Sequence, residues 1–144
     1  MIKMRLVFML FLASLLPACK SAATPALARD EVGQQIAVTG GSYTDISVAE
    51  LQNMLAHKDF TFVNVHMPFE GDIASTDLSI PYNEIQQNLD QLPADKNARI
   101  VLYCRSDRMS RIAAETLVGL DYTNIWNLDG GMLAWEQAGL PLER

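Results

Sequence analysis

One stretch of the sequence decides the fold: Arg-Ile-Val-Leu-Tyr-Cys-Arg-Ser-Asp-Arg-Met-Ser-Arg, residues 99–111. Its apolar run, residues 100–102, predicts a strand that is buried on both faces, as in a parallel sheet. After Asp107, apolar or small residues recur at helical spacing and predict a helix with one core-facing stripe. The stripe consists of Met109, Ile112, Ala113, Thr116, Leu117 and Leu120. Cys104 is therefore expected in a short loop between the carboxyl end of a strand and the amino end of a helix.

The expected position of Cys104 affects the reactivity of its thiol. The first turn of a helix has unpaired N–H groups and a partial positive charge, which together favour an anion. Arg105 and Arg108 add positive side chains nearby, so we expect a partly ionised, nucleophilic thiol. The loop would also suit an anionic ligand or a persulfide on Cys104. A buried structural cysteine is the alternative, and the neighbouring arginines argue against it.

The flanking sequence predicts the remaining elements. A capping box, Ser47 with Glu50, predicts a helix that starts at Ser47 and ends near His57. The other expected elements are an edge strand at 43–46, strands at 60–65 and 125–126, an irregular loop at 66–81, a short helix at 83–92, a helix end at Gly119, and a helix whose core face is Met132, Trp135 and Ala138.

Two motifs resemble those of the rhodanese-domain sulfurtransferases. Residues 103–110, Tyr-Cys-Arg-Ser-Asp-Arg-Met-Ser, are similar to the active-site loop of that family, and residues 127–141 are similar to its closing segment. Residues 62–66 stand where the family has an apolar strand that usually ends in Asp-x-Arg. The similarity extends over residues 46–142. It implies a rhodanese-like α/β fold, with a small parallel β-sheet flanked by helices on both faces.

The resemblance also implies an activity and its site residues. Members of the family move a sulfane sulfur from thiosulfate or a persulfide to a thiol or cyanide, so Cys104 is expected to carry the sulfur as a persulfide. The substrate-binding loop corresponds to Arg105, Ser106, Asp107, Arg108 and Met109, and the supporting residues to Asn64, His66, Gly130 and Gly131. The two glycines are expected to let the backbone approach the cysteine loop closely. No cofactor is implied.

Two other functions remain open on the sequence. The chain is alternatively a membrane-tethered persulfide carrier or binding module with little turnover on small acceptors. A phosphatase or arsenate reductase with a related loop would need an arginine six places after the cysteine, where this chain has Ser110. The loop is therefore better sized for sulfur than for phosphate.

Several loop positions depart from the family pattern. Asp107 occupies a position that is commonly glycine, and its charge is expected to oppose ionisation of the cysteine. Met109 replaces a common arginine and is expected to pack in the core, which leaves Arg108 as the better anion contact. Arg111 is expected to pair with Asp107 and Glu115 on the polar face of the helix.

Asn64 and His66 stand where the family places an Asp and an Arg that brace the loop. We expect His66 to brace the loop by a hydrogen bond, and the alternative is a base beside the cysteine. His57, at a helix end, is expected to act only as a cation there. Neither histidine has partners at metal-ligand spacing, so no metal site is expected.

Composition limits the class of partner. The chain has 144 residues, 49% of them hydrophobic, which suits one domain with a sizeable core. A formal net charge of −6 at pH 7 excludes a general nucleic-acid or anionic-membrane surface. Arg105, Arg108 and Arg111 nevertheless cluster beside Cys104 and predict a small cationic mouth. The expected partners are small sulfur anions or thiols, and a thiol-redox or sulfur-acceptor protein.

The first residues predict export. Lys3 and Arg5 precede an apolar run, residues 6–16, that is too short to span a bilayer and has the pattern of a signal peptide. Residues 16–19, Leu-Pro-Ala-Cys, resemble a bacterial lipobox, in which Cys19 becomes the lipid-modified first residue.

This interpretation sets the expected domain boundaries and location. We expect a signal peptide over residues 1–18, a tether over residues 19–41 and the rhodanese-like domain over residues 42–144. The protein would lie on the periplasmic or cell-surface side, attached to the membrane only through a lipid on Cys19. Cleavage after Ala28 is the alternative. With Cys19 acylated, the second of the two cysteines in the sequence would be a free thiol.

Overall fold

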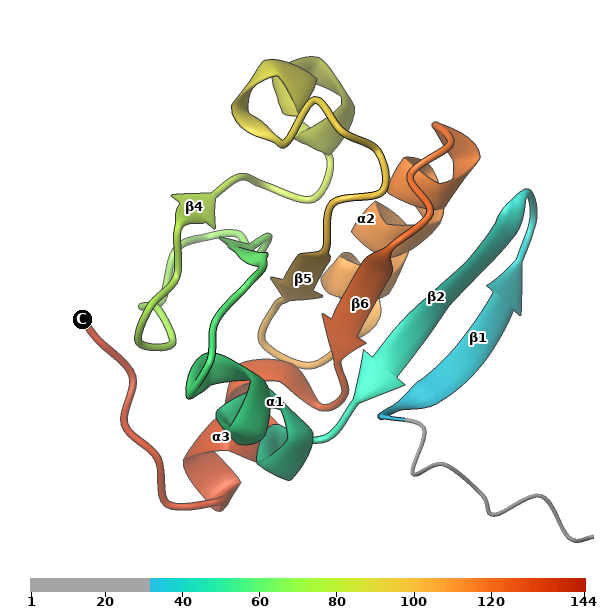
Figure 1. Cartoon of the computed structure of the whole chain (residues 1–144). Coiled ribbons are helices and arrows are strands. Elements are labelled where there is room, and N and C mark those ends of the chain that lie inside the picture. Colours follow the sequence, from blue (N-terminus) through green and yellow to red (C-terminus); the bar gives the residue numbers. More distant parts are fainter. Residues whose placement is uncertain (1–31) are drawn as a thin grey trace, which may run out of the picture.

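The computed structural model describes residues 32–144 (Figure 1). The expected signal peptide over residues 1–18 and the expected lipidation site Cys19 lie outside the described residues. Within residues 32–144, no helix has both the length and the apolar composition that crossing a membrane requires.

A six-stranded sheet forms the centre of the fold, in the order β1-β2-β6-β5-β3-β4. Its strands are β1 (Gln34–Val38), β2 (Gly41–Ile46), β3 (Thr61–Asn64), β4 (Leu78–Ser79), β5 (Ile100–Tyr103) and β6 (Ile125–Leu128). β1 and β2 pair antiparallel, whereas the other pairings in the sheet are parallel. The predicted α/β fold with a mostly parallel sheet is confirmed.

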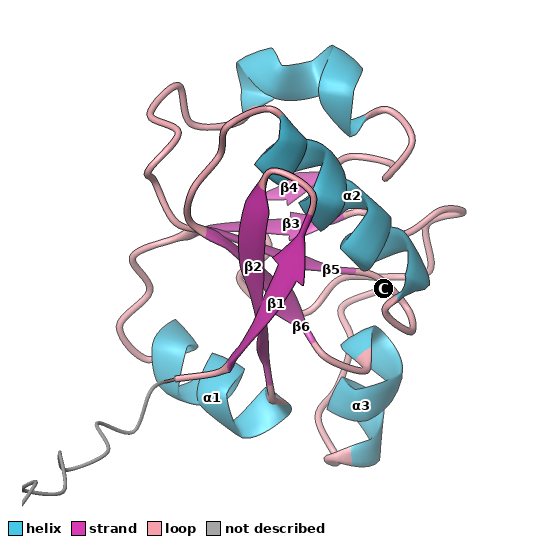
Figure 2. Ribbon diagram, turned by 90° about the vertical axis from the view of Figure 1, so that its right-hand side faces the viewer, coloured by secondary structure: helices cyan, strands magenta, loops and turns pink. Residues whose placement is uncertain are grey.

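Helices cover both faces of this sheet. They are α1 (Val48–Leu55), α2 (Arg108–Gly119), α3 (Gly131–Gln137) and a 3-10 helix, η1 (Ile85–Gln91). The hydrophobic core has two halves: α2 and η1 contribute to one, and α1 and α3 to the other. Figure 2 shows α2 apart from α1 and α3, with the strands between them.

β5 joins the two halves of the core because its side chains alternate between them. Ile100 and Leu102 pack in the half that contains α2, and Val101 and Tyr103 pack in the half that contains α1 and α3. All four residues are fully buried. The strand that precedes Cys104 is therefore held from both faces, as the apolar run predicted.

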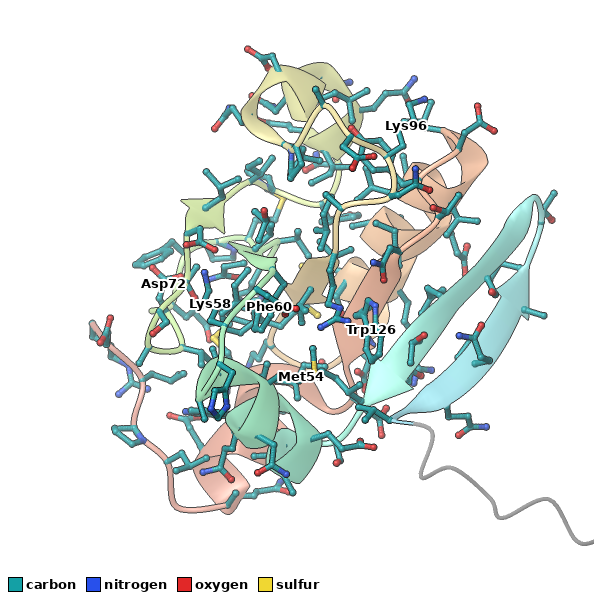
Figure 3. The ribbon with its side chains drawn as sticks, in the orientation of Figure 1. Met54, Lys58, Phe60, Asp72, Lys96 and Trp126 are labelled. Atoms are coloured by element: carbon teal, nitrogen blue, oxygen red, sulfur yellow. The ribbon has the colours of Figure 1, made fainter. Side chains whose placement is uncertain are left out.

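Large side chains lie at the solvent-facing edge of the half of the core that contains α1 and α3. Phe60 is buried there, and Met54 and Trp126 are partly buried against the same cluster (Figure 3). Trp126 donates from its indole nitrogen to Asn124 Oδ1 at 2.6 Å, and the guanidinium of Arg99 lies 5.1 Å from its ring centre. The indole N–H of this partly buried residue thus has a hydrogen-bond acceptor at the boundary between core and solvent.

The prediction of a tether up to residue 41 is wrong for its last part. β1 forms a hairpin with β2, and Gly40 takes a φ of +92° at the turn between them. β2 is consequently an inner strand rather than the expected edge. Residues 34–38, Gln-Gln-Ile-Ala-Val, are too short to show a sustained period, and Ile36 and Val38 pack only partly against the core. The hydrogen bonds of β1 come from the partner strand, which a local pattern does not reveal.

The predicted core stripe of α2 is confirmed in part: Ala113 and Leu117 are buried, and Met109 and Leu120 are partly buried against the core. The buried residues of the helix are Ser110, Ala113, Ala114, Leu117 and Val118. Ile112, expected in the core, is 40% exposed. Small side chains near the start of α2 face the sheet, and this places Ser110 beneath the cysteine loop.

The remaining elements follow the expectations with small differences. The capping box of α1 is confirmed, because Ser47 N–H donates to Glu50 Oε2 at 2.7 Å and Glu50 N–H donates to Ser47 Oγ at 3.3 Å. The short helix is a 3-10 helix with a kink at Asn88, and the loop at 66–81 contains β4. Ala138 is exposed, just beyond the end of α3.

Candidate active site

Cys104 follows β5 directly and is separated from α2 by a short loop, as predicted. Since β5 lies between β6 and β3 and is parallel to both, the cysteine stands at the carboxyl edge of the sheet. Ligands of open α/β sheets bind at this edge. Cys104 is the free cysteine of the described residues and is 2% exposed.

Ser110 contacts the sulfur atom from the first turns of α2. Its Oγ lies 3.4 Å from Cys104 Sγ and 3.0 Å from the carbonyl oxygen of Asp107, and the serine is fully buried. One hydroxyl proton can serve either acceptor, and the stronger attraction of a thiolate would draw it to Sγ. In the sequence, Ser110 stands out only because it occupies the place where a phosphatase loop would need an arginine. Its role depends on the rotation of α2, which placed a serine under the loop.

A small pocket opens beside Cys104. It measures 180 Å³ and is lined by His66, Cys104, Arg105, Ser106, Arg108 and Met109. This volume lies below the ~300–1,000 Å³ of typical pockets for larger ligands. The pocket thus admits a small anion or the reactive end of a thiol. Four of the five predicted substrate-binding residues line it, and the fifth, Asp107, does not.

The charge at the mouth of the pocket is partly neutralised. Arg105 forms an ion pair with Glu70, and both side chains are exposed. Arg111 does not join the mouth, and its predicted partners are wrong: it pairs with Asp45 at 3.2 Å and Asp129 at 3.0 Å. The predicted cationic mouth is therefore reduced to Arg105 and Arg108.

Gly131 lets α3 approach the cysteine loop, as predicted. A Cβ atom on Gly131 would lie 2.3 Å from the carbonyl oxygen of Cys104, and the residue has a φ of +55°. The first amides of α3 use this closeness. Met132 N–H donates to the Cys104 carbonyl at 2.9 Å, and Leu133 N–H donates to the Arg105 carbonyl at 3.0 Å.

Asp107 fixes the other side of the loop. It precedes α2 but its side chain caps no amide of that helix. Instead, its Oδ1 accepts a hydrogen bond from Gly130 N–H at 2.8 Å. Asp107 thus connects the cysteine loop to the turn between β6 and α3.

Asn64 holds the loop that follows β3. Its amide nitrogen donates to the Gly71 carbonyl at 3.0 Å and to Asp72 Oδ1 at 2.9 Å, and its Oδ1 accepts from His66 N–H at 3.0 Å. Asp72, labelled in Figure 3, also accepts from the hydroxyl of Tyr103 at 3.1 Å. Burial raises the pKa of Tyr103, so this hydroxyl stays protonated. Loop 66–72 and strand β5 are thereby joined just before Cys104.

The ring of His66 does not brace the loop in the predicted way. His66 is 8% exposed, and among residues 32–144 neither ring nitrogen has a hydrogen-bond partner. Glu70 Oε1 is 3.6 Å from Nε2, which is an ion-pair distance but too long for a hydrogen bond. The bracing hydrogen bond comes from the backbone amide of His66 rather than from its imidazole.

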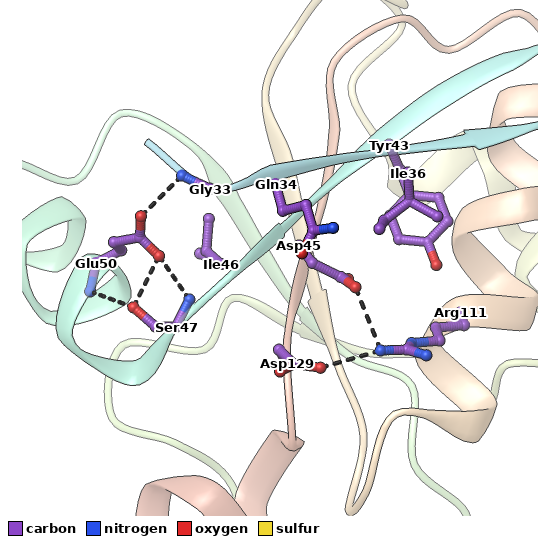
Figure 4. Close-up of a pocket in the computed structure, with 10 residues that line it drawn as sticks. All are labelled: Gly33, Gln34, Ile36, Tyr43, Asp45, Ile46, Ser47, Glu50, Arg111 and Asp129. Carbon is purple, nitrogen blue, oxygen red and sulfur yellow. Dashed lines mark hydrogen bonds and ion pairs between the residues drawn. The ribbon is translucent and has the colours of Figure 1, made fainter. Parts of the chain in front are cut away.

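A larger hollow of 510 Å³ lies along β2 and has different chemistry. Figure 4 shows Arg111 there between Asp45 and Asp129, with Glu50 at the other end. Burial raises the pKa of Asp45 despite the opposing effects of Asn127 and Arg111. None of the residues that line this hollow is a cysteine, so we place the candidate active site at the smaller pocket. In the described part of the chain, no group of three or more His, Cys, Asp or Glu side chains is arranged to hold a metal ion.

Comparisons with known proteins agree with this geometry. The sequence pattern of the Rhodanese-like domain matches residues 47–138. A protein of Allochromatium vinosum named sulfurtransferase is 32% identical over 94 residues, which cover 63% of this chain and 85% of the relative. An uncharacterized protein of Synechocystis is 32% identical over 108 residues, which cover 72% of this chain and 59% of the relative. This chain therefore spans less than two thirds of the Synechocystis protein.

A solved structure is also similar to this chain. The rhodanese-related protein of Thermoplasma volcanium superimposes with a TM-score of 0.60 and 30% identity, over 69% of this chain and 97% of that one. Residues 47–138, which match the Rhodanese-like domain, contain the cysteine loop, the strand before it and the glycine turn that supports it. From its fold, its cysteine loop and these relatives, we conclude that the chain belongs to the rhodanese-like domain family.

Proposed function

We propose that this protein is a sulfurtransferase that moves a sulfane sulfur from thiosulfate or a persulfide to a thiol or cyanide. The observation that carries the proposal is the placement of Cys104, whose sulfur lies at a small pocket with Arg105 and Arg108 and receives the hydroxyl of Ser110. A hydrogen bond from a hydroxyl to a thiolate is charge-assisted and favours the nucleophilic form.

The reaction would proceed in two steps. The Cys104 thiolate attacks the outer sulfur of thiosulfate, a bond forms between Sγ and that sulfur, and sulfite leaves with the electron pair of the broken S–S bond. An acceptor then attacks the transferred sulfur, and Sγ leaves again as a thiolate. The guanidinium groups of Arg105 and Arg108 would attract the anionic donor. Such an exchange predicts ping-pong kinetics.

A persulfide carrier is the second candidate. Glu70 neutralises part of the charge of Arg105, which weakens the attraction for small anionic acceptors. The carrier would hand its sulfur to a thiol-redox or sulfur-acceptor protein and turn over slowly with cyanide. The two candidates share the Cys104 persulfide and differ in how it is discharged.

Mass spectrometry of the intact protein tests both. After incubation with thiosulfate, without cyanide or added thiol, we expect one additional sulfur, and we expect none on the variant Cys104→Ser. Absence of the additional sulfur on the parent protein contradicts the proposal. Rapid loading followed by negligible thiocyanate formation identifies the carrier, and steady thiocyanate formation identifies the enzyme.

Export and lipid attachment at Cys19 complete the proposal. They are supported by the charged start, the apolar run and the lipobox-like residues 16–19. The protein would then work on the periplasmic or cell-surface side, where its acceptor must also lie. The mass of the natively purified protein tests this, because acylation adds the mass of the lipid to a chain that starts at Cys19.

A further inference from the structure

We propose that His66 is the proton-transfer residue for thiol acceptors, an inference that rests on the proposed sulfurtransferase function. The imidazole lines the same 180 Å³ pocket as Cys104. It is 8% exposed, and neither of its nitrogens finds a hydrogen-bond partner among the described residues. A buried polar atom without a partner costs about 1–3 kcal/mol. A side chain kept in this state at the wall of a reactive pocket is explained by a group that binds there.

The surroundings of the ring suit a change of protonation. Neutral imidazole has one donor and one acceptor nitrogen, so it can accept a proton at one and keep the other. Glu70 Oε1 lies 3.6 Å from Nε2 and would stabilise the charged ring. The other charged or titratable groups at this pocket are Arg105, Arg108 and the thiol of Cys104.

Glu70 is shared between the two sides of the pocket. It pairs with Arg105 on the cysteine loop while it faces His66 on its own loop. The side chain of Asn64 accepts a hydrogen bond from the His66 amide and donates one to Asp72. The backbone of His66 is thus fixed, whereas its ring is free of hydrogen bonds within the described region.

A thiol acceptor needs the proton transfer that this ring can perform. Imidazole takes the proton of the acceptor thiol, and the resulting thiolate attacks the outer sulfur of the Cys104 persulfide. A bond forms between the acceptor sulfur and the outer sulfur, the bond from the outer sulfur to Sγ breaks, and its electron pair stays on Sγ. The imidazolium of His66 returns the proton to the transferred sulfur. The products are a persulfide of the acceptor and the Cys104 thiolate, so atoms and charge balance.

Cyanide as an acceptor needs no proton transfer by His66. It attacks as an anion, leaves as thiocyanate and brings no proton. Sulfur transfer to cyanide is therefore independent of the imidazole, and His66 acts as a specificity residue that favours thiols. General acid–base catalysis contributes about 10²–10⁴-fold.

The test separates the two half-reactions. Parent protein and the variants His66→Gln and His57→Gln are loaded with sulfur from thiosulfate, and loading is measured by intact mass. Single-turnover discharge is then measured with cyanide at alkaline pH and with glutathione over a range of pH. His57→Gln is the matched control, because the same substitution is made at an exposed histidine at the end of α1.

We expect all three proteins to load, and His57→Gln to discharge to both acceptors at rates within about twofold of the parent. In His66→Gln, the rate with glutathione should fall at least about 100-fold more than the rate with cyanide. For the parent, the rate per glutathione thiolate should depend on pH, because a proton moves through the ring, and in His66→Gln this dependence should disappear.

Each contrary result has one meaning. Failure of the parent to load contradicts the proposed function and this inference with it. Normal loading with equal slowing toward cyanide and glutathione, or with no slowing toward either, overturns the inference alone. A pH dependence that survives in His66→Gln also overturns it.

Discussion

Replacement of Gly131 by alanine should damage both the fold and the chemistry, because α3 touches the cysteine loop at this residue. The added Cβ would lie 2.3 Å from the Cys104 carbonyl oxygen and 2.9 Å from the Arg105 carbonyl carbon. Ordinary contact begins at 3.4 Å, so the loop and α3 must separate by about 1.1 Å. Both neighbours of the new atom are backbone, which cannot rotate away as a side chain would.

Gly139 supplies the matched control. It has a φ of +80°, close in kind to the +55° of Gly131, but nothing lies within 4 Å of its would-be Cβ. Gly139→Ala should therefore show only the cost of a left-handed backbone, about 1–2 kcal/mol. Gly131→Ala should add the cost of overpacking, about 1–3 kcal/mol. A shift of about 1 Å in a reacting group also costs about 100-fold in rate.

Two measurements decide the matter. Urea denaturation gives the free energy of unfolding of both variants, and intact mass after rapid mixing with thiosulfate gives the rate of persulfide formation. We expect Gly139→Ala to load at the parental rate and Gly131→Ala to be both less stable than Gly139→Ala and slower to load. Equal stability of the two variants, together with equal loading, would refute the role assigned to the contact.

Three further substitutions each test one hydrogen-bonding side chain. Ser110→Ala removes the donor to Cys104 Sγ, and since a hydrogen bond to a charged group is worth about 1.5–3 kcal/mol, persulfide formation should slow at least about tenfold in rapid-mixing mass measurements. Tyr103→Phe removes the acceptor of the buried Ile73 N–H and should lower the urea-derived stability by about 1–3 kcal/mol. Glu50→Gln acts through pH: hydrogen bonds from Ser47 lower the pKa of Glu50, so the carboxylate stabilises the fold at neutral pH and this contribution is lost as the pH falls through the folded-state pKa. The variant should be less stable than the parent at pH 7 and equally stable in acid, as measured by denaturation at each pH.

Local patterns predicted the centre of the molecule well. The run that became β5 is apolar at every position, and a strand buried on both faces needs that composition. The capping box marked the start of α1 because its two hydrogen bonds lie within four residues. The glycine pair at 130–131 indicated a close approach, and the structure shows which backbone atoms approach.

Local sequence patterns did not predict side-chain and strand partners that are distant in the sequence. Arg111 has acidic residues at helical spacing, yet it pairs with Asp45, 66 positions away, and with Asp129, 18 positions away. The i,i+4 spacing describes an isolated helix, whereas the packing of α2 against β2 and β6 brings two buried or strand-end carboxylates to the guanidinium. β1 was missed for the same reason, since its hydrogen bonds belong to β2.

Asp107 shows how the loop keeps its shape while departing from the family's usual glycine. The position requires a φ of +75°, which explains why glycine is common there. Aspartate tolerates positive φ better than most residues. Its carboxylate also accepts the amide of Gly130 at 2.8 Å, an interaction that glycine cannot make. The hydrogen bond offsets the backbone cost and ties the cysteine loop to the turn before α3. The same carboxylate brings negative charge toward the cysteine loop, so the departure keeps the geometry of the site and changes its electrostatics. Beside Cys104, this negative charge is met by the Ser110 hydroxyl, 3.4 Å from Sγ, and by Arg105 and Arg108 in the lining of the pocket.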